Sequence, residues 1–176
     1  MTSFLYFAYG SNLLRQRLQV ENPSARFVSS AKLEGYRLGF TSLGMDPMKL
    51  RWRGGAATIL DDPGHVVWGC VWRVSTEHRD SLDRQELIYN PIEVKVTDGD
   101  NAVYTCRTYQ LPAEYLVTSC YDNRPSPMYM DVIVRGALQN ALPAEYVDDL
   151  RAVEHNGHYE DIDLHKNILK ILEKEK

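Results

Sequence analysis

The chain has 176 residues, 44% hydrophobic and 25% charged, which is typical of one soluble globular domain, here expected to span residues 1–176. A formal net charge of −4 argues against nucleic acid as a partner, because nucleic-acid-binding proteins normally carry a basic patch. No apolar run approaches the roughly 20 residues of a membrane helix, the first residues lack a signal-peptide pattern, and three widely spaced cysteines predict no disulfide framework. We therefore expect a cytoplasmic protein that binds no membrane.

Segments with strand propensity alternate with turn-forming clusters through the first two thirds of the chain. Strands are predicted over residues 3–9, 26–33, 36–41, 56–60, 66–74, 92–97 and 103–111. Turns are predicted at residues 34–35, 61–64 and 98–101, and a loop over residues 42–55. The segment 66–74 is apolar on both sides for most of its length, so we expect both of its faces to be buried.

Helices are predicted mainly in the last third of the chain. A short helix over residues 13–18 follows the first strand, with Ser11 or Asn12 as its cap, and a charged helix runs from Ser75 to Glu86. Helical spacing then covers residues 128–142, 143–155 and 161–175. Strands first and helices late predict an α+β fold, a curled or closed sheet with helices packed around it.

Several motifs with known chemistry are missing from the sequence. It contains no phosphate-binding loop, no dinucleotide-binding glycine pattern, no hydrolase nucleophile elbow and no H-E-x-x-H zinc motif. His155 and His158 lie among acidic residues, but their spacing defines no metal geometry, and we interpret this segment as a solvated turn between helices. We predict no cofactor and no metal.

The segment from Tyr6 to Leu13 is the most informative part of the sequence. A strand ends at Gly10-Ser11-Asn12 and a helix begins at once, which presents free backbone N–H groups on a turn where glycine permits close approach. Such a turn suits a small anion such as a carboxylate. The alternative is that Ser11 only caps the helix and Gly10 only makes the turn.

Three further features have both a functional and a structural interpretation. A carboxylate at the end of the charged helix, in Leu82–Glu86, is a candidate general base if burial raises its pKa, or part of a solvated helix face. Two prolines in Pro125–Tyr129 fix the chain before a helix and orient Tyr129, either toward a ligand or into the core. Glycines in Trp52–Ala56 either bring backbone close to a ligand or make a turn before a strand.

Taken together and in this order, these segments resemble the γ-glutamylcyclotransferase family over about Phe4 to Tyr146. The matching segments are Phe7–Leu14, Asn22–Ala25, Gly54–Ile59, Val67–Gly69, Leu82–Glu86, Ile92–Val96 and Pro125–Tyr129. The resemblance implies a small mixed β-barrel with surrounding helices, found in a cytosolic homodimer without cofactor. It also implies an enzyme of glutathione metabolism that converts γ-glutamyl amino acids to 5-oxoproline and the free amino acid.

The resemblance also assigns roles to particular residues. It implies a substrate-binding loop made of Tyr6, Phe7, Ala8, Tyr9, Gly10 and Ser11. Glu86 is implied as the catalytic acid/base, and Tyr129 as the residue that completes the pocket. One departure stands out: family members usually have a glycine and several more residues after the catalytic glutamate, whereas here Leu87-Ile88-Tyr89 follow Glu86 directly.

Alternatives remain open at this point. Relatives with a similar Tyr-Gly-Ser loop act on glutathione or on γ-glutamyl-ε-lysine. The short segment after Glu86 is also compatible with a non-catalytic protein that binds carboxylates. A protein-interaction module is a third alternative, for which the exposed face of the helix over residues 161–175 is the one indication, and we interpret that face as ordinary surface.

Overall fold

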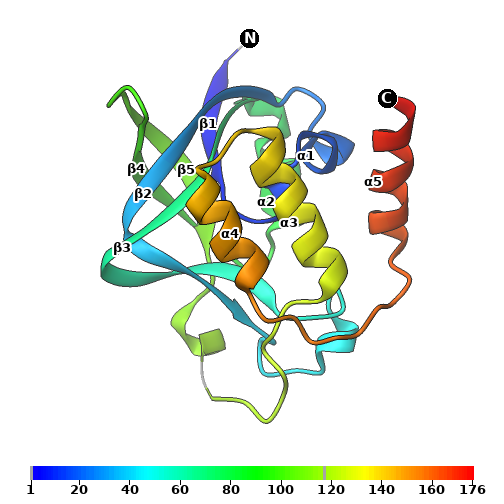
Figure 1. The fold of residues 1–176 in the computed structure, drawn as a ribbon. Coiled ribbons are helices and arrows are strands. Elements are labelled where there is room, and N and C mark those ends of the chain that lie inside the picture. Colours follow the sequence, from blue (N-terminus) through cyan, green and yellow to red (C-terminus); the bar gives the residue numbers. More distant parts are fainter. Residues whose placement is uncertain (1, 117) are drawn as a thin grey trace.

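The computed structural model describes residues 2–116 and 118–176, and in this part of the chain five strands close into a barrel with helices around it (Figure 1). The strands are β1 (Ser3–Ala8), β2 (Arg26–Thr41), β3 (Ala56–Ser75), β4 (Asn90–Asp98) and β5 (Val103–Gln110). Their order around the barrel is β1-β3-β2-β4-β5, and a parallel contact between β1 and β5, Tyr6 opposite Arg107, closes it. The expected α+β barrel with surrounding helices is confirmed.

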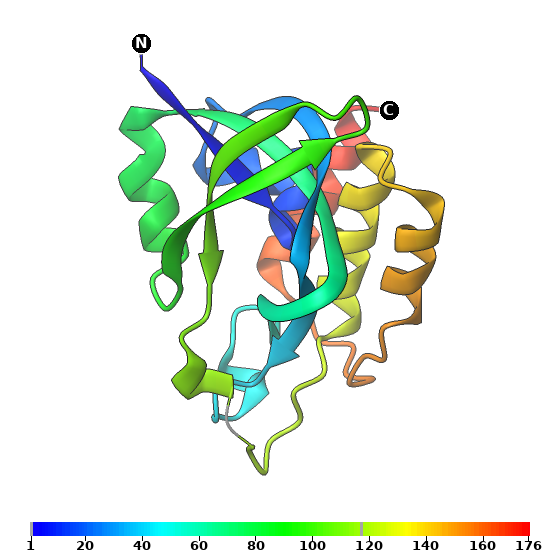
Figure 2. The ribbon, with the colours of Figure 1, turned by 90° about the vertical axis from the view of Figure 1, so that its left-hand side faces the viewer.

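The two longest strands correct the predicted turns at residues 34–35 and 61–64. β2 and β3 each run without interruption through these residues, and their pairing shifts register between Glu34 and Tyr36. Gly35 and Gly64, with φ of 83° and 92°, supply the left-handed backbone that such a bulge requires. Figure 2 shows both strands bending strongly, so that each serves more than one wall of the barrel. Turn-forming residues here bend a strand instead of ending it.

The barrel core is built mainly on β1 and β3. Phe7 and Trp72 are fully buried. From Val67 to Val74 every residue is buried except Trp68, which is partly exposed, and Arg73, which is exposed. This part of β3 is therefore buried on both faces, as predicted. The ring of Phe7 lies against Gly69, where an added Cβ would come within 2.6 Å of it. A side chain at Gly69 would therefore separate β1 from β3.

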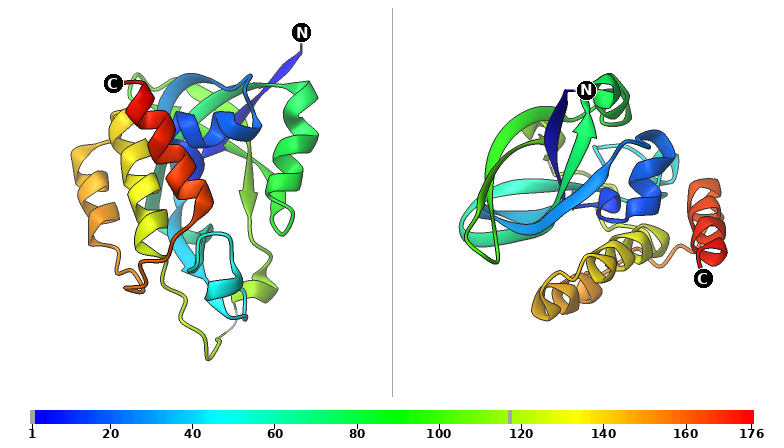
Figure 3. Two further views of the ribbon diagram at one scale, coloured as in Figure 1. Left: turned by 90° about the vertical axis from the view of Figure 1, so that its right-hand side faces the viewer. Right: turned by 90° about the horizontal axis from the view of Figure 1, so that it is seen from above.

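Five helices are found in the described residues: α1 (Arg15–Glu21), α2 (Arg79–Gln85), α3 (Pro127–Gln139), α4 (Ala144–Ala152) and α5 (Asp163–Lys174). The late helices α3, α4 and α5 pack on one side of the molecule, and α2 lies on the opposite side (Figures 2 and 3). Gly136 lets α3 approach the start of α1 closely, because a Cβ there would lie 2.5 Å from the Leu14 nitrogen. None of these helices combines the length and the apolar character needed to cross a bilayer.

The segment after β1 differs from its prediction. Ser11–Leu13 form one turn of 3₁₀ helix, and α1 begins only at Arg15, after the extended Leu14. Neither Ser11 nor Asn12 caps α1 with its side chain, so both predicted caps are wrong. The Asn12 amide instead donates a hydrogen bond to the Tyr6 hydroxyl at 3.1 Å, because the extra turn directs it back toward β1. The charged helix is also shorter than predicted, since its first turn, Thr76–His78, is 3₁₀ helix and Ser75 makes no cap bond.

Candidate active site

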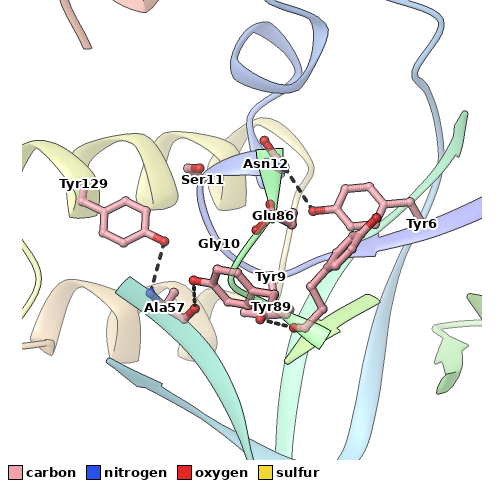
Figure 4. A pocket seen from close by; sticks show the side chains of 10 residues that line it. Tyr6, Tyr9, Gly10, Ser11, Asn12, Ala57, Glu86, Tyr89 and Tyr129 are labelled. Atoms are coloured by element: carbon pink, nitrogen blue, oxygen red, sulfur yellow. Dashed lines mark hydrogen bonds between the residues drawn. The ribbon is translucent and has the colours of Figure 1, made fainter. Parts of the chain in front are cut away.

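A small pocket lies where β1 passes into the 3₁₀ turn, between the start of β3, the end of α2 and the start of α3 (Figure 4). Its volume is about 40 Å³, and a wider cavity of about 340 Å³ lies beside it, since Ser11, Glu86, Tyr89 and Tyr129 line both. The residues that line the small pocket are Tyr6, Tyr9, Gly10, Ser11, Asn12, Ala57, Glu86, Tyr89, Tyr109 and Tyr129. Hydroxyl groups therefore make up much of its wall.

Strand β1 contributes only some of its predicted site residues to this wall. Tyr6 and Tyr9 line the pocket, whereas Phe7 and Ala8 do not. The Phe7 side chain belongs to the barrel core, and its carbonyl accepts a hydrogen bond from the Thr108 hydroxyl at 2.8 Å. The Tyr9 hydroxyl donates to the Tyr109 carbonyl, which ties the end of β1 to β5. Phe7 and Ala8 hold the strand in place while Tyr6 and Tyr9 face the pocket.

Gly10, Ser11 and Asn12 of the turn after β1 line the pocket. The N–H groups of Leu13 and Leu14 donate to the carbonyls of Gly10 and Ser11, at 3.0 and 3.2 Å. The N–H groups that precede them, on Ser11 and Asn12, have no acceptor within the turn, as at the start of any helix. At Gly10 an added Cβ would lie 3.4 Å from the Tyr129 hydroxyl, so the missing side chain leaves this part of the pocket open.

Tyr129 is oriented by the start of α3. The Ser126 hydroxyl accepts a hydrogen bond from the Tyr129 N–H at 3.1 Å, and Pro127 occupies the first helical position, as this sequence pattern favours. The Tyr129 ring stacks on Trp52, with centroids 5.2 Å apart and 8° between the planes. Its hydroxyl oxygen accepts a hydrogen bond from the Ala57 N–H at 3.3 Å, so the hydroxyl proton is free to be donated to a bound molecule.

A glycine pair brings the Tyr129 segment close to β3. The Gly55 N–H donates to the Arg124 carbonyl at 2.8 Å, and an added Cβ at Gly55 would lie 2.0 Å from the Asn123 carbonyl oxygen. At Gly54 it would lie 2.3 Å from the Ser126 nitrogen. The close backbone approach observed at this segment is to another part of the chain, and approach to a ligand stays a prediction. Gly54 in addition lines the wider cavity.

Glu86 lies directly after the last residue of α2, and Figure 4 shows its carboxyl among the Ser11–Asn12 turn and the tyrosines. Burial raises the pKa of this carboxyl from 4.5 to about 7, against the opposing effect of the positive charges of Arg17 and Arg51. A carboxyl group with a pKa near neutrality can both accept and donate a proton at physiological pH.

The short segment after Glu86 forms a tight turn. The Tyr89 N–H donates to the Glu86 carbonyl at 2.9 Å, which returns Tyr89 to the pocket, and its hydroxyl donates to the Ala57 carbonyl at 2.6 Å. Leu87, at the tip of the turn, is 80% exposed. The tight turn therefore brings both Glu86 and Tyr89 to the same pocket, with only two residues between them.

Asp83, the other carboxylate of this helix region, has a different environment. It forms a 2.8 Å ion pair with Arg107 and accepts a 2.5 Å hydrogen bond from the Tyr109 hydroxyl. It does not line either cavity. Glu86 and Asp83 are three residues apart, but only Glu86 faces the pocket.

Sequence reasoning missed Tyr109, Arg17 and Arg51. Tyr109 reaches the pocket from β5, which pairs with β1 only through barrel closure. The Arg17 side chain is 1% exposed and lies along the wider cavity, 3.6 Å from the Glu21 carboxylate. The spacing of Arg17 from Leu13 and Leu14, four and three residues before it on the predicted helix, is the one signal for an apolar face at Arg17. Arg51 carries no comparable local signal.

In the part of the chain that the structure describes, His155 and His158 belong to no group of three or more potential metal ligands. The His155 ring instead contacts the Tyr159 ring edge-on, and Glu154 pairs with Arg124 at 2.6 Å.

Comparison with known proteins points to one family. The AIG2-like family model matches residues 66–150. Over 158 residues the chain is 44% identical to the gamma-glutamylcyclotransferase of Mus musculus, covering 88% of this chain and 80% of the relative. The Homo sapiens protein of the same name is 42% identical over 160 residues, covering 89% and 81%. A solved structure named gamma-glutamyl cyclotransferase superposes with a TM-score of 0.86 at 40% identity, covering 98% of this chain and 99% of the other.

Proposed function

This chain belongs to the γ-glutamylcyclotransferase family, and we propose on that premise that it converts γ-glutamyl amino acids to 5-oxoproline and the free amino acid, with Glu86 as acid/base. The observation that carries the assignment of Glu86 is its position. Its carboxyl is the one carboxyl lining the pocket within the described residues, and burial raises its pKa to about 7.

The reaction needs no nucleophile from the enzyme. The α-amine of the substrate attacks its own γ-carbonyl carbon, a C–N bond closes the five-membered ring, and the C–N bond to the departing amino acid breaks. Holding amine and carbonyl together contributes much of the acceleration, since effective molarities of oriented intramolecular reactions reach about 10⁵–10⁸ M. Glu86 takes the proton that the attacking amine loses and delivers it to the nitrogen of the leaving group.

The loop of Tyr6, Phe7, Ala8, Tyr9, Gly10 and Ser11 is proposed as the substrate-binding segment. Within it, the free N–H groups of the turn at Ser11 suit the α-carboxylate or the negative charge that develops on the γ-carbonyl oxygen. The Tyr129 hydroxyl, with its proton available, is a second donor for the same charges. Phe7 and Ala8 contribute indirectly by anchoring the strand.

We also propose that the protein acts in the cytoplasm as a homodimer, takes part in glutathione metabolism, and uses no metal or other cofactor. The chemistry above is complete with the side chains and backbone groups of the chain, so activity should survive exhaustive chelation. Gel filtration with light scattering should give twice the 20.2 kDa mass of the chain. A monomer, or activity that EDTA removes and zinc restores, would contradict these two points.

The central experiment is incubation with γ-glutamyl-L-alanine, glutathione and γ-glutamyl-ε-lysine in parallel, with 5-oxoproline as the measured product. Turnover of γ-glutamyl-L-alanine in preference to the other two supports the proposal. Preference for glutathione or for γ-glutamyl-ε-lysine would assign the protein to a related activity. Binding of 5-oxoproline by calorimetry without any turnover would identify a non-catalytic carboxylate-binding protein.

A further inference from the structure

The wider cavity beside the pocket has no role in the mechanism so far. Its volume of about 340 Å³ suits a small ligand group. Because Ser11, Glu86, Tyr89 and Tyr129 line both spaces, a substrate with its scissile amide at Glu86 extends from one space into the other. If the γ-glutamyl part occupies the tyrosine-lined pocket, as the proposed function requires, the departing amino acid lies in the wider cavity.

Arg51 lies at this cavity without a carboxylate of its own. In the described residues no acidic group is within 4 Å of its guanidinium, whereas Arg17 in the same wall pairs with Glu21. Its positive charge opposes the rise that burial causes in the pKa of Glu86, and both residues line this cavity. Arg51 is therefore a cation without an acidic partner, in the described residues, that lines the same cavity as the carboxyl proposed to protonate the leaving nitrogen.

The geometry of an amino acid matches this placement. Its carboxylate carbon is two bonds, about 2.5 Å, from the nitrogen that Glu86 protonates. A cation that binds this carboxylate must consequently lie close to Glu86 as well. An arginine is suited to the task because its planar guanidinium binds a carboxylate through two parallel hydrogen bonds.

The rest of the cavity wall is largely apolar. Its large aliphatic and indole side chains belong to Leu43, Leu50, Trp52, Leu87 and Ile88. Leu87 and Ile88 are 80% and 39% exposed, and both belong to the tight turn between Glu86 and Tyr89. Large exposed apolar side chains at the mouth of a pocket are typical of a ligand-contacting surface.

We propose that the wider cavity is the subsite for the departing amino acid, where Arg51 binds its α-carboxylate and the Leu87–Ile88 turn contacts its side chain. The enzyme accordingly selects γ-glutamyl derivatives of apolar amino acids with a free α-carboxylate. Glutathione fits this subsite less well, because its free carboxylate lies one residue further from the scissile amide.

The first test compares γ-glutamyl-L-alanine with γ-glutamyl-L-alanine amide in the intact enzyme and in Arg51→Gln. We expect the intact enzyme to prefer the free acid by about 10- to 100-fold in kcat/KM, the range of a hydrogen bond to a charged group. Arg51→Gln should abolish that preference by raising KM for the acid, with little change for the amide. Any effect of Arg51 on the Glu86 pKa applies to both substrates, so it cancels in their ratio.

Lys49→Gln is the matched control, because Lys49 is an exposed cation two residues away that lines neither pocket. Lys49→Gln should leave the ratio of kcat/KM for the acid to kcat/KM for the amide unchanged. If Arg51→Gln lowers kcat/KM equally for the acid and the amide, or if the intact enzyme does not prefer the acid, the proposed carboxylate subsite is wrong. Either result leaves the proposed function standing. Absence of turnover with every γ-glutamyl substrate would instead remove the proposed function itself.

A second test addresses the apolar turn. Leu87→Ser should lower the ratio of γ-glutamyl-L-leucine to γ-glutamyl-L-alanine turnover several-fold, because the larger side chain loses its apolar contact. Leu138→Ser, at a leucine 52% exposed on α3 and outside both cavities, should not change the ratio. If Leu87→Ser and the intact enzyme show the same ratio of γ-glutamyl-L-leucine to γ-glutamyl-L-alanine turnover, the Leu87–Ile88 turn does not contact the departing amino acid.

Discussion

Glu86 and Asp83 differ in what surrounds them far more than in type or position. The Asp83 carboxylate is occupied by Arg107 and Tyr109, whereas the Glu86 carboxyl faces an open pocket. Burial disfavours the charged form of a carboxyl, and the pKa of Glu86 accordingly rises to about 7. The same residue type thus serves as a structural ion-pair partner at one site and as a candidate proton carrier at the other.

Replacement of Glu86 by glutamine tests this difference. Glu86→Gln preserves size but cannot accept the proton of the amine, so kcat should fall by at least the roughly 10²–10⁴-fold that general base catalysis contributes. Asp83→Asn is the control and should remain substantially active, because an amide oxygen can still accept from Arg107 and Tyr109. Near-full activity of Glu86→Gln with inactive Asp83→Asn would move the acid/base to Asp83.

The pH profile tests the pKa itself. Since Glu86 must be deprotonated to accept a proton, kcat/KM should rise with pH with a midpoint near 7, the pKa of about 7 that burial gives to Glu86 in the free enzyme. Measurement across pH 4–9 with γ-glutamyl-L-alanine gives the midpoint directly. A midpoint near 4.5 would show an ordinary, solvated carboxyl.

At the scale of elements, the site depends on glycines, which let a turn or the start of a helix approach neighbouring backbone or the pocket closely. The 3₁₀ turn after β1 reaches the pocket across Gly10, and the start of α3 reaches β3 across Gly54 and Gly55. The three glycines serve close packing in different ways: Gly10 leaves room in the pocket, and Gly54 and Gly55 permit contact between two backbones.

Gly10→Val is expected to block the pocket. Its Cβ would already lie 3.4 Å from the Tyr129 hydroxyl, and the two added methyl groups extend into the space that the ligand needs. The variant should fold, as judged by circular dichroism, but should not bind 5-oxoproline in calorimetry or turn over substrate. Normal turnover by folded Gly10→Val would show that this turn does not contact the substrate.

Gly55→Ala is expected to destabilise the fold. Its Cβ would lie 2.0 Å from a carbonyl oxygen of the segment that leads into α3, so this backbone must shift, and Tyr129 with it. Overpacking of this kind costs about 1–3 kcal/mol, measurable as a lower midpoint in urea denaturation, with activity reduced as well. Gly99→Ala, where an added Cβ meets nothing within 4 Å, is the control and should keep the stability of the parent. Equal stability of the two variants would contradict the close packing.

For the whole molecule, the partly buried Glu86 carboxyl lowers the free energy of unfolding at the pH where it is active. Its pKa is raised from 4.5 to about 7 on folding, so the folded state binds more protons than the unfolded state between these values. The free energy of unfolding therefore falls as pH rises through this window. The full shift corresponds to at most about 3 kcal/mol, and the partial exposure of the side chain reduces it.

Glu86→Gln should consequently be more stable than the parent at pH 8 and no more stable near pH 4, where both side chains are neutral. Urea denaturation at the two pH values measures this difference. A parent protein as stable as Glu86→Gln at pH 8 would mean that burial imposes no penalty on the ionised carboxyl.

Local sequence determined the kinds of element and most of their positions. Strand propensity and apolar spacing correctly predicted most strands and the late helices, and the two prolines of Pro125–Tyr129 correctly predicted that a helix follows them. These features depend on residues close together in the chain, which is why they can be recognised without a partner. The barrel, the family and the candidate roles of Glu86 and Tyr129 came from the resemblance of ordered motifs.

Tertiary structure decided the features that depend on a distant partner. Whether Gly35 and Gly64 end a strand or bend it depends on the strand opposite. Because β2 and β3 pair on both sides of these glycines, the strands continue through them with a shift in register. Barrel closure brings Tyr109 to the small pocket, and chain packing brings Arg51 to the wider cavity beside it. The raised pKa of Glu86 is a property of burial. The sequence places a carboxyl at the end of a helix, and only the surrounding chain removes it from water.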